Sequence, residues 1–123
     1  MKARPLSPHL QVYRPQLTSV LSIMHRLTGL ILLLFALLWL SWLAALVNGA
    51  EAYAKLTSLL AGLPGQLILI AVSWALFYHM ANGIRHLLWD AGWLLDLSGA
   101  YASGWTVLIV SFAATGIYWG MIL

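Results

Sequence analysis

Two short segments bring ionisable side chains into otherwise apolar stretches of the chain. They span residues 22–29 and residues 78–90. Their ionisable members are His25 and Arg26 in the first segment, and His79, Arg85, His86 and Asp90 in the second. Imidazoles can ligate a metal or the iron of a haem, while guanidinium and hydroxyl groups bind ligands that carry oxygen. Ionisable groups inside apolar segments are costly, so both segments are candidates for a functional site.

The histidines of the second segment have the spacing of one helix face. His79 and His86 are seven residues apart, so on a helix they share a face about 10 Å apart along the axis. Gly83 lies between them and leaves room for a flat ligand. Haem iron takes an axial imidazole, and its propionates need polar partners near water. This layout predicts His79 as the axial ligand, with His86 and His25 near the propionates.

Plainer interpretations of the same histidines stay open from spacing alone. His79 is also compatible with a buried imidazole that forms a hydrogen bond to a neighbouring helix. His25 and His86 are also compatible with interfacial side chains that reach toward water.

Ser22 and Arg26 are one helical turn apart and lie one above the other. A quinone head group needs donors for its two carbonyl oxygens, in a cleft that is open to lipid for its tail. A hydroxyl and a guanidinium in this position predict a quinone-binding site. The alternative is that Arg26 only sets the membrane topology and that Ser22 is a helix-packing residue.

Composition identifies the surroundings of these groups as lipid. The chain has 123 residues, of which 63% are hydrophobic and 7% charged, whereas ordinary soluble domains carry about 25% charged residues. It has no cysteine, which excludes disulfides, thiolate metal sites and iron–sulfur ligation. The net charge of +3 comes from scattered basic residues, so no nucleic-acid partner is expected.

Three apolar stretches are long enough to cross a membrane. We predict one all-α transmembrane domain over residues 1–123, with helices at about 19–48, 64–91 and 104–123. Residues 49–63 and 92–104, rich in turn residues, are predicted to connect them. The fold class is therefore an all-α integral membrane protein with three transmembrane helices.

Charge bias predicts the orientation of the three spans. Basic residues concentrate before the first span, at Lys2, Arg4 and Arg14. Positive segments stay inside, so residues 1–18 are expected to be cytoplasmic, and both polar segments then fall in the inner leaflet. From the helical rise, His79 lies roughly 16 Å deep. Tryptophans near the inner interface fit the aromatic belt of that side, and they are Trp89, Trp93 and Trp105.

The two segments resemble a known family when the preceding residues are included. The sequence RPLSPHLQVYR at 4–14, followed by SIMHRLTG at 22–29, resembles the N-terminal pattern of the cytochrome b556 subunit of succinate dehydrogenase. The pattern HxxxGIRHxxxD at 79–90 is similar to its second motif. The resemblance covers the whole chain, including its length and the three spans.

This resemblance implies a membrane anchor of respiratory complex II in a bacterial inner membrane. The partners it implies are a second hydrophobic anchor subunit, an iron–sulfur subunit and a flavoprotein subunit. His79 matches the axial ligand of a haem b shared with the second anchor, and His25, Arg26 and His86 match positions near the propionates. Ser22 and Arg26 match residues of the ubiquinone site. The chain alone would then be no enzyme, but would pass electrons from the iron–sulfur subunit to ubiquinone.

Three other functions fit the sequence less well. The single anchor of a dihaem quinol:fumarate reductase needs more helices and about four intramembrane histidines. An assembly protein without a cofactor would not need His79. A small transporter or channel subunit would need polar residues through both leaflets, whereas the outer half here is apolar.

Overall fold

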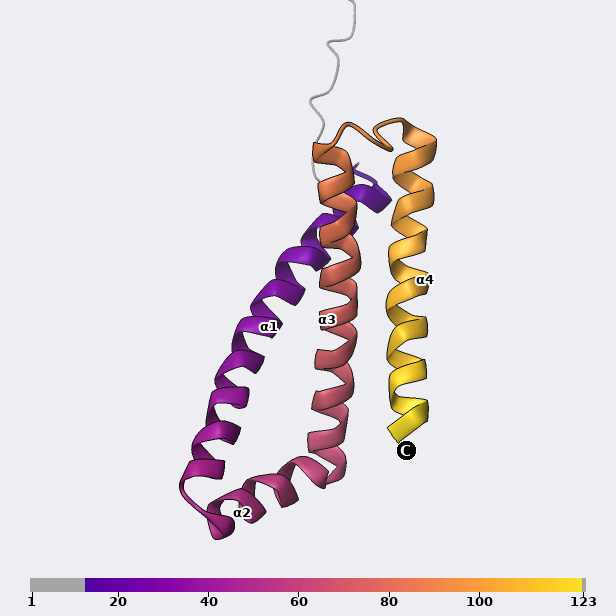
Figure 1. Ribbon diagram of the computed structural model, residues 1–123. Coiled ribbons are helices and arrows are strands. Elements are labelled where there is room, and N and C mark those ends of the chain that lie inside the picture. Colours follow the sequence, from indigo (N-terminus) through magenta and orange to yellow (C-terminus); the bar gives the residue numbers. More distant parts are fainter. Residues whose placement is uncertain (1–12, 123) are drawn as a thin grey trace, which may run out of the picture.

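The computed structural model describes residues 13–122, which form four helices and no strand (Figure 1). Residues 1–12 of the predicted cytoplasmic segment lie outside the described part. The helices are α1 (Leu17–Val47), α2 (Ala50–Ala61), α3 (Leu63–Asp90) and α4 (Leu97–Ile122).

Three of these helices are long and apolar enough to cross a membrane. They are α1, α3 and α4, with 31, 28 and 26 residues, and about 20 residues suffice for the hydrocarbon core. Many of their large apolar side chains are exposed, as a lipid-facing surface requires. The predicted class, an all-α membrane protein with three spanning helices, is confirmed.

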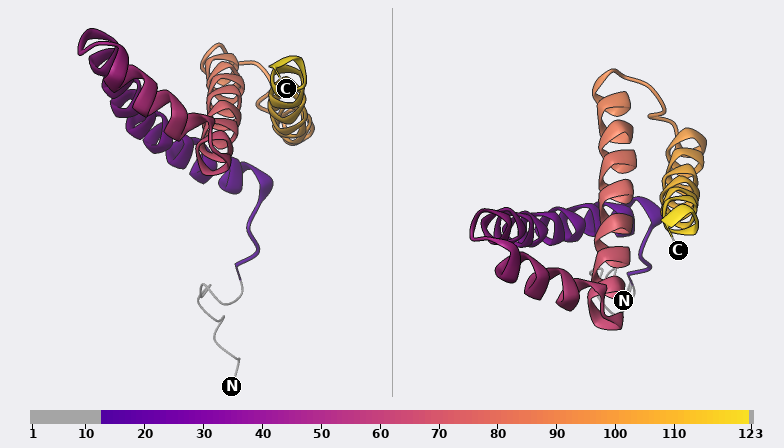
Figure 2. Two further views of the ribbon diagram at one scale, coloured as in Figure 1. Left: turned by 90° about the horizontal axis from the view of Figure 1, so that it is seen from below. Right: turned by 60° about the horizontal axis from the view of Figure 1, so that its bottom comes forward.

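Helix α3 occupies the centre of the molecule, with α4 running alongside it (Figure 1). The start of α1 packs against the end of α3, and α1 then leans away along its length (Figure 1). Helix α2 bridges the resulting gap and returns the chain to α3 (Figures 1 and 2). The two polar segments therefore meet where α1 and α3 are closest.

The first connection differs from the sequence prediction, because residues 50–61 of the expected 49–63 link form helix α2. Its sequence, AEAYAKLTSLLA, consists largely of good helix formers. Glu51 lies in the first turn, where it complements the helix dipole, and Lys55 follows at i+4. The predicted turn residues lie only at the two ends of α2. Gly49 comes directly before this helix and has a φ of 105°, a backbone conformation that favours glycine.

Helix α4 also begins earlier than predicted, at Leu97 rather than near residue 104. The carboxylate of Asp96 caps it by accepting hydrogen bonds from the Ser98 hydroxyl and, at 3.0 Å, from the Gly99 amide. These bonds hold the pKa of the Asp96 carboxyl below its usual range. Gly104 is a packing residue within the helix and not a turn residue, since a Cβ there would lie 2.8 Å from Leu21 Cδ1.

A small buried core joins the three spanning helices. It contains Leu21 of α1, Tyr78 of α3 and Val107 of α4. The Tyr78 hydroxyl is fully buried and donates a 2.7 Å hydrogen bond to the Leu21 carbonyl oxygen. This bond fixes the register of α1 against α3 one residue before His79.

Replacing Tyr78 by phenylalanine should lower the free energy of unfolding by about 1 kcal/mol, because one buried hydrogen bond is lost while the ring is kept. The matched control is Tyr118→Phe on α4, where the side chain is about half exposed (47%). Thermal unfolding of the purified complex in detergent measures both variants. Equal melting temperatures for the two variants would show that the Tyr78 hydroxyl does not stabilise the α1–α3 contact.

Candidate functional site

The three histidines of the two segments form one column between α1 and α3. The rings of His25 and His79 are stacked, with centroids 3.9 Å apart and an interplanar angle of 11°. The rings of His25 and His86 are also stacked, at 5.0 Å and 21°. His25 of α1 therefore contacts both histidines of α3, and the structure brings together all three residues that the sequence singled out.

Hydrogen bonds assign the tautomer of His79. Its Nδ1 lies 3.2 Å from the His25 carbonyl oxygen and 3.2 Å from Thr28 Oγ1. The Thr28 hydroxyl donates its own hydrogen to the same carbonyl at 2.9 Å. Because a carbonyl oxygen can only accept, we assign the imidazole proton to Nδ1. The lone pair on Nε2 is then available to a metal, the arrangement typical of histidine ligands.

Small residues let the two helices approach at this point. A Cβ on Gly29 would lie 3.2 Å from His79 Cε1, tighter than nearly all real contacts. Thr28 beside it is buried. On α3, a Cβ on Gly83 would lie 4.0 Å from His25 Cε1, which is ordinary contact. The missing side chain of Gly29 thus leaves the space in which the His79 ring packs against α1. Gly83 lies beside the His25 ring.

His25 and His86 keep polar atoms that another molecule could use. The Nδ1 of His86 lies 2.7 Å from the Asn82 carbonyl oxygen, which assigns the proton to Nδ1 and leaves Nε2 free. The Nδ1 of His25 is buried and has no hydrogen-bond partner within residues 13–122. Buried polar atoms are nearly always paired, so this orphaned nitrogen indicates a missing partner.

The donor set fits an iron porphyrin better than a bare metal ion. No group of three histidine, cysteine or acidic side chains within residues 13–122 is placed to hold a metal ion. A haem needs only axial ligands such as imidazole from protein, because the porphyrin supplies the equatorial ligands. One available Nε2 on His79, with free polar atoms on His25 and His86, meets that requirement.

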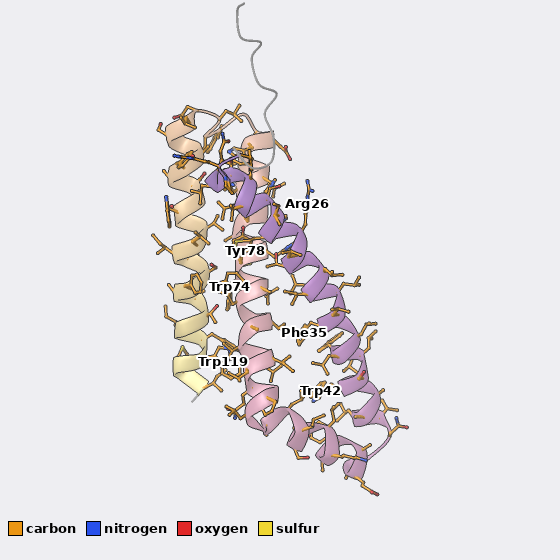
Figure 3. The ribbon with its side chains drawn as sticks, turned by 180° about the vertical axis from the view of Figure 1, so that it is seen from behind. Arg26, Phe35, Trp42, Trp74, Tyr78 and Trp119 are labelled. Atoms are coloured by element: carbon orange, nitrogen blue, oxygen red, sulfur yellow. The ribbon has the colours of Figure 1, made fainter. Side chains whose placement is uncertain are left out.

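Ser22 and Arg26 line a single cleft between α1 and α3. The cleft has a volume of about 370 Å³ and is also lined by Ser19, His86 and Trp89. Arg26 is exposed and projects outward from α1 (Figure 3), while Ser22 is half-buried. A permanent cation and a hydroxyl on one wall can hold a ligand that carries partial negative charge on oxygen.

Arg85 has a structural role that the sequence analysis did not predict. Its side chain is 2% exposed, yet its hydrogen-bond acceptors within residues 13–122 are all neutral. Nε donates to Ser103 Oγ at 2.9 Å and Nη2 donates to the Ala100 carbonyl at 2.8 Å, while Nη1 donates to Asn82 Oδ1 at 3.3 Å. The guanidinium thereby ties α3 to α4. The position of Arg85 within the second polar segment was the sequence signal for a special role. Its acceptors lie on α4, and the spacing of residues along α3 could not identify them.

The fold and the site define a small polytopic membrane protein with its histidine column and two arginines near one end of the spanning helices. The sequence profile of the succinate dehydrogenase/fumarate reductase transmembrane subunit family matches residues 1–118. The chain therefore belongs to this family, as the resemblance of its motifs implied.

Individual relatives agree with the family assignment. The chain is 42% identical over 116 residues to the succinate dehydrogenase cytochrome b556 subunit of Rickettsia bellii, covering 94% of this chain and 90% of the relative. It is 44% identical over 100 residues to the cytochrome b556 subunit of Paracoccus denitrificans, covering 81% and 77%. The cytochrome b560 subunit of Reclinomonas americana is 39% identical over 122 residues, with 94% and 84% covered.

Proposed function

We propose that this chain holds a haem b through His79 and contributes Ser22 and Arg26 to the quinone-reduction site of a succinate dehydrogenase. The observation that carries the proposal is the hydrogen bonding of His79. Its Nδ1 is engaged by the His25 carbonyl and Thr28 at 3.2 Å each, so its Nε2 is free to ligate iron. The relatives named as cytochrome b556 subunits support the haem assignment.

His25 and His86 serve the same group. With Arg26 near the cleft, they would supply hydrogen-bonding and cationic partners for the propionates. The family resemblance implies that a partner anchor subunit would supply a second histidine to the iron, while His25 and His86 are stacked in the column with His79. When bound, the haem supplies a one-electron redox centre.

Reduction of a quinone places negative charge on its carbonyl oxygens. Arg26 is permanently charged and lines the cleft, so it stabilises that charge in a site of low dielectric constant. Ser22, one turn earlier on α1, donates a hydrogen bond to the second oxygen or passes on a proton. Ubiquinone is the substrate that this pair of donors would accept in a chain surrounded by lipid.

The electrons must come from outside this chain. It has no cysteine, so an iron–sulfur subunit supplies them, and a flavoprotein subunit oxidises succinate. Both dock at the membrane surface nearer to the cleft. We place that side in the cytoplasm of a bacterium, with the chain in the inner membrane, because the basic residues of the N-terminal segment favour the inside.

Replacement of His79 by alanine should remove the axial ligand and with it the low-spin haem b spectrum of the complex. The matched control is Met80→Ala, the next residue on α3, whose side chain is 55% exposed. Reduced-minus-oxidised spectra and redox titration of the purified complex measure both. An unchanged α-band and an unchanged midpoint potential in His79→Ala would contradict the assignment of the ligand.

Replacement of Arg26 by leucine should slow succinate–quinone reduction on the order of 10²–10³-fold, by analogy with the loss of one oxyanion donor. Succinate oxidation with an artificial dye acceptor should stay near normal, because the dye takes electrons before the quinone site. Arg14→Leu, an exposed arginine before α1, is the control and should leave both activities unchanged. Equal loss of both activities in Arg26→Leu would assign this residue to assembly, and no loss in either would place the quinone elsewhere.

A further inference from the structure

A second cavity, with a volume of about 410 Å³, lies between α3 and α4 and has no lining residue from α1. Its lining is mostly apolar, and Ile84 and Val110 on its walls are 53% and 48% exposed. These walls therefore reach the surface that faces lipid. Arg85 is the one charged residue in the lining, and it is the only residue that the cavity shares with the cleft of Ser22 and Arg26.

The positive charge of Arg85 has no counter-ion among residues 13–122. The three acidic residues of the sequence are Glu51, Asp90 and Asp96, and none of them accepts a hydrogen bond from Arg85. The three neutral acceptors use three of the five N–H donors that a guanidinium carries. A buried charge without a partner is costly, above all within a membrane span. An anion from outside the chain is therefore expected beside Arg85.

The charged and the apolar parts of the cavity lie at different heights along the helices. Arg85 is five residues before the end of α3 at Asp90, roughly 7–8 Å along the axis. Its Nη2 reaches the carbonyl oxygen of Ala100 in the first turn of α4, so the charge lies toward the α3–α4 loop. Ala81 and Val110 line the other end of the cavity. One charged end and one apolar end match the shape of a membrane lipid with an anionic head group.

We propose that this cavity binds an anionic phospholipid, with the phosphate of the head group beside Arg85 and an acyl chain along Ala81 and Val110. Basic pockets between transmembrane helices bind such head groups, and a guanidinium holds phosphate through charge-assisted hydrogen bonds. The bound lipid would join α3 to α4 at the end where Arg85 already ties them. This lipid site goes beyond the proposed function, since it needs neither the haem nor the quinone.

The test compares anionic phosphatidylglycerol with zwitterionic phosphatidylcholine as ligands of the complete complex. The complex is delipidated in detergent and titrated with each lipid, and bound lipid is counted by native mass spectrometry. The wild-type complex should bind one phosphatidylglycerol more than Arg85→Gln does. Its affinity for this lipid should be about fivefold higher than for phosphatidylcholine, the effect expected of one basic residue near a membrane surface.

Ala102→Phe tests the cavity without replacing a hydrogen-bonding partner of Arg85. Ala102 is exposed and lines one wall, so a phenylalanine there should fill the space and remove the same lipid. The matched control is Ala113→Phe, at an exposed position of α4 outside the lining, and it should bind as the wild type does. This pair decides the outcome if Arg85→Gln does not assemble.

Three results would overturn the lipid site. Equal phosphatidylglycerol binding by the wild-type complex and by Ala102→Phe would leave the cavity without a lipid, and a carboxylate of a partner subunit would be the remaining counter-ion. A loss in Arg85→Gln alone would place the anion in the cleft of Ser22 and Arg26. Displacement of the lipid by inorganic phosphate at equal concentration would show a site for a free anion. Each of these results leaves the proposed function standing, because Ala102 does not line the cleft of Ser22 and Arg26.

Discussion

The close approach of α1 and α3 at one end of the molecule positions every polar group of the candidate site. Two hydrogen bonds from α3 to carbonyl oxygens of α1 hold it, from Tyr78 to Leu21 at 2.7 Å and from His79 to His25 at 3.2 Å. Gly29 permits it, because any side chain there would press on the His79 ring. In lipid, polar groups cannot find water, so the helix contact itself must satisfy them.

The consequences of this contact extend in two directions. Toward the middle of the helices it half-buries the imidazole column, and toward the start of α1 it forms the cleft of Ser22 and Arg26 between the same two helices. Farther along, α1 leans away from α3 and its exposed surface is apolar (Figure 3). Arg85 then couples α4 to this end. One local contact thus serves a candidate cofactor site and a candidate substrate site.

The spanning helices could be predicted because lipid imposes a length and a composition that can be read directly. The two polar segments could be found because ionisable residues are rare in such surroundings. The stacking of His25 between His79 and His86 could not, since it depends on how α1 crosses α3. Helical spacing on a single helix carries no information about that crossing.

Each departure from the sequence prediction has a physical cause. Glycines were interpreted as turn residues, yet Gly104 lies inside α4 and makes room for Leu21. The residues of α2 were assigned to a connection because glycines flank them, although their own composition favours a helix. The acceptors of Arg85, Ser103 and Ala100, lie on another helix and could not be found from the second polar segment alone. Tertiary packing decides the cases of Gly104 and Arg85, and local helix propensity decides that of α2.

The central claim is that this chain presents His79 Nε2 to the iron of a haem beside the cleft of Ser22 and Arg26. The most direct test is a cryo-electron microscopy map of the complete complex purified from membranes. We expect haem iron bonded to His79 Nε2, with the propionates directed toward His25 and His86. Iron bonded to His25 or His86 of this chain, or a complex with no haem in contact with α3, would contradict it.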